Sequence, residues 1–103
     1  MNNDDFNAAL GRLQPFLDGS GRLIQMPPAR KIRRIALEYL ASHFDFGRQY
    51  SEKQVNAMLG HLHTFSDAAL LRRELVEAGY FGRQGQGEGA RYWRTDARAK
   101  DEQ

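Results

Sequence analysis

The stretch LLRRELVEAGYFGR, residues 70–83, decides the fold of this 103-residue chain. Leu71, Leu75 and Ala78 recur at the spacing of one helix face, and Gly79 suits the left-handed conformation that often ends a helix. The aromatic pair that follows the glycine favours a strand. The stretch therefore predicts a helix that ends at a glycine and leads directly into a strand.

A hairpin is predicted after this helix. Its strands span residues 80–84 and 90–94, and the connecting GQGEG is rich in glycine. A glycine-rich loop that holds phosphate would lead into the N-terminus of a helix, whereas these glycines link two strands. We expect the aromatic residues Phe81, Tyr92 and Trp93 to complete the hydrophobic core.

Two further helices are predicted before residue 70. Apolar residues form a stripe at helical spacing from Pro28 to Phe44, and Pro28 suits the first turn of that helix. The second helix begins at Ser51, where Ser-Glu-Lys-Gln has the pattern of a capping box. The RQY segment before it, residues 48–50, is expected to form a very short strand.

A tight connection, HTFS at residues 63–66, joins the second helix to the third. Thr64 or Ser66 is expected to cap the third helix, which runs through Ala78. The DGSG segment, residues 18–21, predicts a turn, and RLIQM after it predicts a short extended piece.

Three helices followed by a hairpin predict a winged helix-turn-helix. Its class is mainly α with a small β-hairpin (α+β), and a short N-terminal helix precedes it at residues 4–14. We expect one domain over residues 1–94 and a polar, flexible tail at residues 95–103.

The composition is typical of a small globular domain, with 41% hydrophobic and 27% charged residues. There are no cysteines, which excludes disulfides and cysteine-ligated metal sites. The N-terminus lacks the basic start and apolar run of a secretory signal, and no stretch approaches membrane-spanning length. We expect a cytoplasmic protein without a cofactor.

Positive charge is concentrated in ARKIRR, residues 29–34, although the net charge is only +2. These cations fall in the first turns of a helix, where the helix dipole disfavours positive charge. Two interpretations remain open, namely a surface held for an anionic partner and a merely solvated helix face.

The third helix is less suited to reading bases than its paired arginines imply. Its outward face carries Leu70 and Arg73 together with the carboxylates of Asp67, Glu74 and Glu77. Carboxylates are repelled by phosphates, and a major-groove reader usually presents Arg, Lys, Asn or Gln. Weak sequence reading is therefore expected.

Arg72 lies on or beside the inward face of the same helix. We interpret it as a structural residue, with its stem packed and its guanidinium paired with Asp67 or Glu77.

Arginines on the predicted hairpin are followed by Arg98 and Lys100. These cations support the hypothesis that the chain binds phosphate groups. We expect the helix-start cations and the hairpin cations to form one shared surface for negative charge. The candidate nucleic-acid-binding residues are Arg30, Lys31, Arg33, Arg34, Arg73, Arg83, Arg91 and Arg94.

No catalytic motif is present: the chain has neither a nucleophile elbow nor a phosphate loop, so we do not expect an enzyme. A metal site remains open at His61, His63 and Asp67, with His43 as a third histidine. Residues two apart on a helix point nearly opposite ways, so the two neighbouring histidines could share a metal only beyond the end of the helix.

Residues 16–94 resemble the bacterial family called domain of unknown function 2087. The resemblance is carried by GRL at residues 21–23, YSEKQVN at 50–56, DAALLRRELV at 67–76 with the glycine after it, and RYW at 91–93. It implies a small protein that stands alone or is attached to helix-turn-helix regulators, for which nucleic-acid binding has been suggested and no activity is established.

Two functions from different classes follow as hypotheses. The first is a nucleic-acid-binding module in transcription regulation that acts mainly through phosphate contacts. The second is a protein-interaction or dimerisation module on the same scaffold, whose partner meets the hairpin edge or the outward face of the third helix around Leu70, Glu74 and Glu77. Neither hypothesis involves a membrane.

Overall fold

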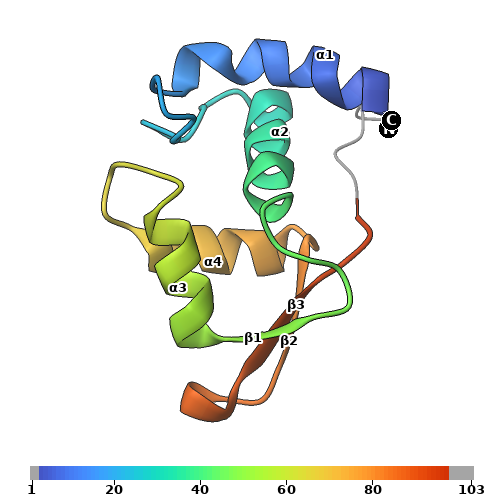
Figure 1. Cartoon of the computed structure of the whole chain (residues 1–103), viewed down its shortest axis with the longest axis vertical. Helices are drawn as coiled ribbons and strands as arrows, with labels where there is room; N and C mark the ends of the chain where they lie inside the picture. Colours follow the sequence, from blue (N-terminus) through green and yellow to red (C-terminus); the bar gives the residue numbers. More distant parts are fainter. Residues whose placement is uncertain (1–2, 98–103) are drawn as a thin grey trace.

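The computed structural model describes residues 3–97 and has an α+β arrangement (Figure 1). The described part of the chain contains four α-helices, two short 3-10 helices and a three-stranded antiparallel sheet. In chain order the elements are α1 (Asn3–Leu13), the short helix η1 (Gln14–Phe16), α2 (Arg30–Ala41), β1 (Gln49–Ser51), α3 (Glu52–Gly60), α4 (Ala68–Glu77), β2 (Phe81–Gln84), the short helix η2 (Gly87–Gly89) and β3 (Arg91–Arg94).

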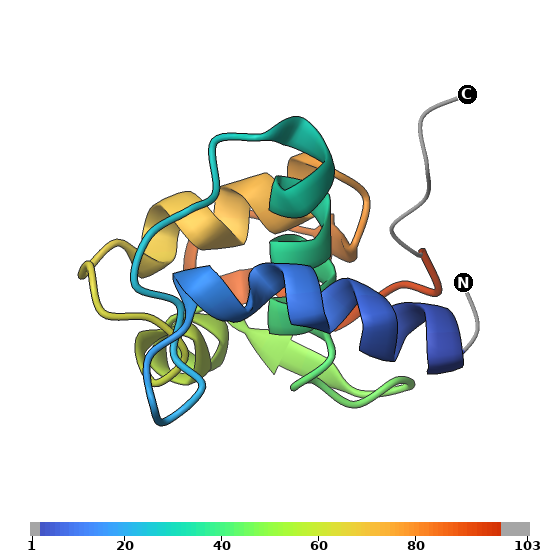
Figure 2. The same cartoon turned by 90° about the horizontal axis from the view of Figure 1, so that it is seen from above.

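The helices and the hairpin are arranged along the long axis of the molecule. In Figure 1, α1 lies at one end, the turn of the β2–β3 hairpin lies at the other, and α2 lies between them. Viewed from above, α1 crosses over α2 (Figure 2). No helix of residues 3–97 is both long enough and apolar enough to cross a membrane.

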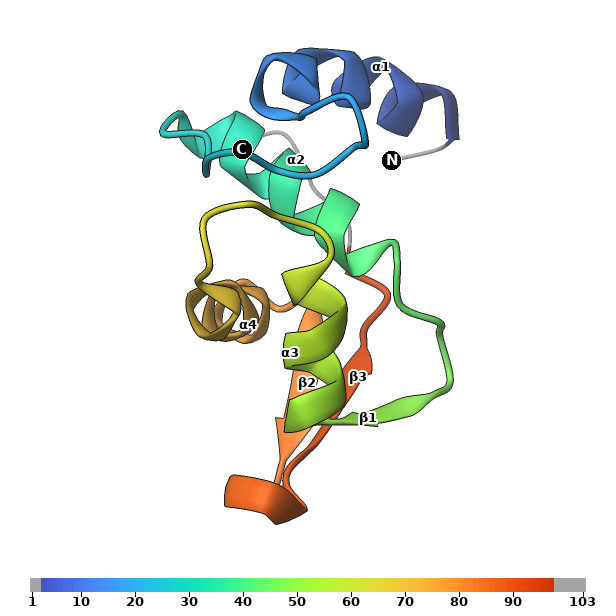
Figure 3. The ribbon, with the colours of Figure 1, turned by 60° about the vertical axis from the view of Figure 1, so that its left-hand side comes forward.

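The sheet has the strand order β1-β3-β2, with β3 in the centre. Tyr50 pairs with Tyr92 across β1 and β3, while Gly82 pairs with Trp93 across β2 and β3. Successive side chains in a strand point to opposite faces. Tyr50, Phe81 and Tyr92 therefore share the inner face, where all three are buried against the helices. Figure 3 shows α3 and α4 packed together against the sheet.

The expected role of Trp93 in the core was wrong. Phe81 and Tyr92 belong to the buried core, whereas Trp93 is half-buried and lies on the opposite face of the sheet. A Cβ atom added to Gly82 would lie 2.2–2.4 Å from the nearest Trp93 ring atoms. The indole ring therefore covers the backbone of Gly82, on a face where only a glycine leaves room for it.

The predicted start is correct for α3 and requires changes for α2 and α4. The capping box is present, since Ser51 accepts a hydrogen bond from the Gln54 backbone and the Gln54 side chain accepts one from Ser51. Helix α2 runs only over Arg30–Ala41, so Pro28 precedes it instead of filling its first turn. The extended conformation of Ala29, with φ of −71° and ψ of 128°, delays its start.

The cap of α4 is Asp67, so the expectation of Thr64 or Ser66 was wrong. Ser66 has a left-handed φ of 57°, which turns the chain so that Asp67 takes the capping position. The Asp67 Oδ1 atom accepts a hydrogen bond of 3.2 Å from the Leu70 backbone. At the other end of the helix, Gly79 has the predicted left-handed conformation, with φ of 87°.

The segment between η1 and α2 is hydrogen-bonded to the connection between α3 and α4. The backbone of Leu23 donates to Leu62 at 2.8 Å and accepts from Thr64 at 3.0 Å. The predicted extended piece RLIQM is thus reduced to isolated bridges at Leu23, which pairs with Leu17 and with His63. This pairing attaches the N-terminal part of the chain to the turn between the two helices.

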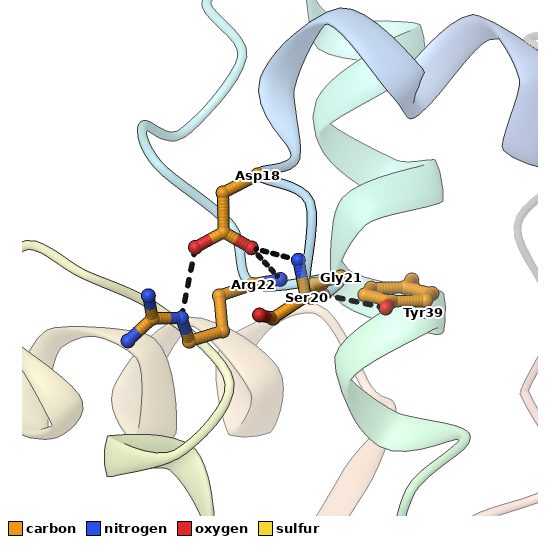
Figure 4. A network of polar contacts seen from close by, with 5 residues as sticks. All are labelled: Asp18, Ser20, Gly21, Arg22 and Tyr39. Atoms are coloured by element: carbon orange, nitrogen blue, oxygen red, sulfur yellow. Dashed lines mark hydrogen bonds and ion pairs between the residues drawn. The ribbon is translucent and has the colours of Figure 1, made fainter.

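Asp18 organises the predicted turn at residues 18–21 (Figure 4). Its carboxylate accepts from the backbones of Ser20 and Arg22 at 2.9 and 2.8 Å and from Arg22 Nε at 2.8 Å. These hydrogen bonds, with that from the Arg22 backbone foremost, lower the pKa of Asp18. The Tyr39 hydroxyl donates to the Gly21 carbonyl at 2.6 Å and thereby ties the turn to α2.

Candidate functional site

A cleft between α4 and the hairpin is lined mainly by charged side chains. The cleft has a volume of about 370 Å³. The charged residues that line it are three arginines and two glutamates. The lining residues are Glu52, Arg72, Arg73, Val76, Glu77, Arg83 and Tyr92.

Tyr92 is the centre of a polar network that forms one wall of the cleft. Its hydroxyl accepts a hydrogen bond from Arg83 Nε and donates one to Glu52 Oε1, both at 3.0 Å. The Arg72 and Arg83 guanidinium carbons lie 5.9 and 5.7 Å from the centre of the Tyr92 ring, within cation–π range. The network thus joins α3, α4 and both strands of the hairpin.

Arg72 completes this network as a structural residue, as predicted, but with different partners. It donates to Asn56 Oδ1 and lies 3.7 Å from Glu52 Oε1. The expected pairing with Asp67 or Glu77 was wrong, because Arg72 points across to α3 instead of along its own helix. Its side chain is only 13% exposed, so it supports the wall of the cleft.

Arg73 and Arg83 are the exposed cations of the cleft. Arg73 lies on α4, and within residues 3–97 it makes no hydrogen bond or ion pair. Arg83 projects from β2 and is held by Tyr92. Two guanidinium groups from separate elements therefore face one hollow, an arrangement that can bind a phosphate group.

The other hairpin arginines lie elsewhere. Arg91 is exposed and lines a second hollow, of about 450 Å³, that also contains Gln49, Ser51 and Lys53. Arg94 is half-buried: it donates to the Phe44 carbonyl at 3.2 Å, and its guanidinium lies 3.9 Å from the centre of the Phe46 ring. Arg98 and Lys100 fall outside the described residues.

The cations at the start of α2 are separated from the hairpin turn. Figure 1 shows the beginning of α2 next to α1 and the turn of the hairpin at the opposite end of the molecule. Arg30 and Lys31 are exposed, whereas Arg33 forms an ion pair with Glu74 of α4. The start of α2 therefore lies apart from the turn of the hairpin, and Arg33 is paired with Glu74.

Arg34 and Glu74 are both partly buried. Arg34 is half-buried near Tyr80, whose pKa is raised to about 12 by burial and by Glu38, with Arg34 opposing that rise. Glu74 was expected on the outward face of α4, which was wrong, because its side chain is only 16% exposed and faces Arg33. The outward face of α4 thus loses one of its three predicted carboxylates.

The histidines considered as metal ligands have separate environments. His63 is buried, with Nδ1 donating to the Leu59 carbonyl at 2.7 Å and Nε2 accepting from the Asp67 backbone at 2.9 Å. His61 is exposed, and so is His43, whose Nδ1 lies 2.9 Å from the Tyr39 carbonyl. No group of three metal-ligating side chains is present in the described part of the chain.

Sequence reasoning missed three residues that shape these hollows. Glu52 was read only as part of the capping box, and Tyr92 only as a core aromatic. Lys53 was not singled out at all. The register of the sheet was the missing information, because it places Tyr92 opposite Arg83.

A comparison with protein families identifies one match. The model of the family DUF2087, described as an uncharacterized protein conserved in bacteria, matches residues 22–94. Comparisons with curated proteins and with solved structures found no match.

Proposed function

The chain belongs to the DUF2087 family of uncharacterized bacterial proteins, and we propose that it is a cytoplasmic winged helix-turn-helix module that binds duplex DNA. In this proposal α3 and α4 form the helix-turn-helix, and the β2–β3 hairpin is the wing. The proposal includes a role in transcription regulation.

The observation that carries the proposal is the convergence of Arg73 and Arg83 on the cleft. If α4 enters a major groove and the wing lies over the adjacent backbone, the cleft between them faces the phosphates of one strand. Arg73 would contact this strand from the helix side and Arg83 from the wing side. Contacts to phosphates fix the position of a protein on the duplex and carry no direct sequence information.

The exposed face of α4 limits how much sequence can be read. Its exposed residues in the helix are Ala69, Leu70, Arg73 and Glu77. Arginine pairs with guanine and glutamate accepts from cytosine, so two of these residues could contact base edges. The proposed module therefore binds DNA mainly through the backbone, and its affinity falls steeply with salt.

The experiment is a duplex-binding titration with a labelled random-sequence DNA at about 50 mM salt, where phosphate contacts remain strong. We expect Arg73→Gln and Arg83→Gln each to weaken binding and the double variant to weaken it further. Arg12→Gln is the matched control, since Arg12 is an exposed cation at the end of α1. An absence of duplex binding by the unmodified protein would refute the proposal.

The cations at the start of α2 provide an internal comparison. We expect the double variant Arg30→Gln/Lys31→Gln to bind duplex DNA nearly as well as the unmodified protein, because these residues begin a helix far from the hairpin turn. A loss of binding in this variant, with Arg73 and Arg83 intact, would move the contact surface to α2.

The second function is a protein-interaction or dimerisation module, and one observation favours it. Leu70 is a large apolar side chain on α4 that is 37% exposed. The outer edge of β2 is also available for strand pairing, since β2 lies at the end of the sheet. Loss of self-association or partner binding in Leu70→Asp, with folding intact, would support this function over DNA binding.

A further inference from the structure

We propose that the outer face of the sheet binds single-stranded DNA, with Trp93 as a stacking platform for a base. We define the outer face as the side of the sheet opposite the buried Tyr50, Phe81 and Tyr92, carrying Gln49, Ser51, Gly82, Gln84, Arg91 and Trp93. This surface is separate from the cleft, which lies on the inner side of the same hairpin.

Trp93 has the geometry of a platform. Its indole ring covers Gly82, where a Cβ atom would approach ring atoms to 2.2–2.4 Å. One ring face is therefore supported by backbone, and the ring does not join the hydrophobic core. The helices that pack on the sheet lie on its inner side (Figure 3), whereas Trp93 belongs to the outer face. Single-strand-binding proteins stack bases on aromatic rings presented in this manner.

The polar residues beside the ring are amides. Gln49 pairs with Trp93 in the sheet register, and Gln84 pairs with Arg91. Both glutamines are exposed. A glutamine side chain both donates and accepts hydrogen bonds, as the edges of unpaired bases do. The ring is thus bordered by groups that can contact a stacked base.

The adjoining hollow supplies positive charge. It contains Lys53 and Arg91, together with polar and small residues, and none of its lining residues is acidic. Lys53 makes no ion pair within residues 3–97, and Arg91 is bonded only to the neighbouring Ala90 carbonyl at 3.1 Å. Residues two apart on a strand lie about 7 Å apart, so Arg91 lies within reach of a backbone whose base stacks on Trp93. Charge complementarity therefore favours a polyanion over a protein segment.

The choice of DNA over RNA rests on the proposed function. A helix can enter the major groove of DNA, whereas the deep, narrow major groove of an RNA duplex excludes it. A duplex held at the cleft would therefore be DNA, and we take the strand at the outer face of the same hairpin to be DNA as well. The single-strand surface itself does not depend on this choice.

The chain contains one tryptophan, so its intrinsic fluorescence reports on this surface directly. The probe is oligo(dT) of about 12 nucleotides, within the site size of small single-strand-binding domains. We expect saturable quenching of Trp93 emission, with a log–log salt slope of about −1.4 for two neutralised phosphates. No saturable quenching at about 50 mM salt would overturn the proposal.

Variants separate stacking from charge. We expect Trp93→Leu to weaken binding of a labelled oligo(dT) at least about fivefold and Trp93→Phe to weaken it less, because a ring still stacks. We expect Arg91→Gln and Lys53→Gln each to reduce the salt slope by about 0.7, with Arg12→Gln unchanged as the control. If Trp93→Leu fails to fold, the phenylalanine and charge variants still decide the outcome. Unaltered binding in those variants would overturn the proposal.

Further arms distinguish the ligands and the two surfaces. Tighter binding of oligo(U) than of oligo(dT) would overturn the choice of DNA. Salt-independent quenching by an uncharged proline-rich peptide, with none by oligo(dT), would assign the face to a protein. We expect Arg73→Gln/Arg83→Gln to leave oligo(dT) binding unchanged. Oligo(dT) binding without duplex binding would refute the proposed function and leave this inference standing. Duplex binding without oligo(dT) binding would overturn this inference and leave the proposed function standing.

Discussion

Replacing Tyr92 with phenylalanine removes one hydroxyl group from the centre of the network between the hairpin and the helices. That hydroxyl accepts from Arg83 and donates to Glu52, both at 3.0 Å. A hydrogen bond contributes about 0.5–1.5 kcal/mol, and more when a partner is charged. Water can replace part of the loss, because Arg83 is exposed and the Glu52 side chain is 36% exposed. We therefore expect the free energy of unfolding to fall by about 1–2 kcal/mol.

Thermal unfolding followed by circular dichroism measures this loss. For a domain of this size, it corresponds to a decrease in Tm of about 5–15 °C. Duplex affinity should fall as well, because Arg83 loses its anchor and must be immobilised on binding. That cost is about 0.5–1.5 kcal/mol for one long side chain, or about twofold to tenfold in Kd.

Tyr39→Phe is the matched control for this prediction. It also removes one tyrosine hydroxyl, which donates to the Gly21 carbonyl at 2.6 Å in the turn between η1 and α2 (Figure 4). We expect it to lower Tm without changing duplex affinity. The reasoning is refuted if Tyr92→Phe matches the unmodified protein in both measurements, or if the Tyr39 variant weakens duplex binding equally.

Further predictions concern the cap, the sheet and the pH dependence. Gly82→Ala should displace the Trp93 ring and cost about 1–3 kcal/mol, seen as a shift in tryptophan emission and a lower denaturant midpoint; an unshifted emission would contradict the packing. Asp67→Ala should cost about 1 kcal/mol through loss of the α4 cap, measured by urea unfolding, where an unchanged midpoint would count against it. Because the pKa of Asp18 is lowered in the folded state, its stabilisation is present above the pKa of the unfolded chain and is lost as pH falls through the folded value; Asp18→Asn should flatten the acid limb of the stability curve. Burial raises the pKa of Tyr80 to about 12, so stability should decline between about pH 10 and 12, with a phase of phenolate absorbance near pH 12 that Tyr80→Phe removes; the same phase in that variant would contradict this.

Local signals in the sequence predicted those features of the fold that depend on neighbouring residues. The capping box at Ser51 and the left-handed Gly79 are each determined within one turn of the chain. The cap of α4 was missed because the left-handed conformation of Ser66 moves that position to Asp67. A serine with positive φ is uncommon, so the sequence carries no local signal for it.

The candidate site depends on pairings between distant residues, and the sequence does not encode these in any local pattern. Arg33 and Glu74 are 41 residues apart, as parts of two helices whose contact the helical periodicity cannot predict. Tyr92 and Glu52 are 40 residues apart. Alternation along β3 predicts that Tyr92 and Trp93 lie on opposite faces, but the hydrophobicity of both side chains concealed which one belongs to the core.

The salt dependence of duplex binding tests the central claim most directly. Log Kd for a random-sequence duplex is measured against log salt for the unmodified protein, for Arg73→Gln/Arg83→Gln and for Arg30→Gln/Lys31→Gln. Each lost phosphate contact reduces the slope by about 0.9, so the cleft variant should show a slope shallower by about 1.8. The α2 variant should retain the slope of the unmodified protein. An unchanged slope in the cleft variant, or a loss confined to the α2 variant, would contradict the account.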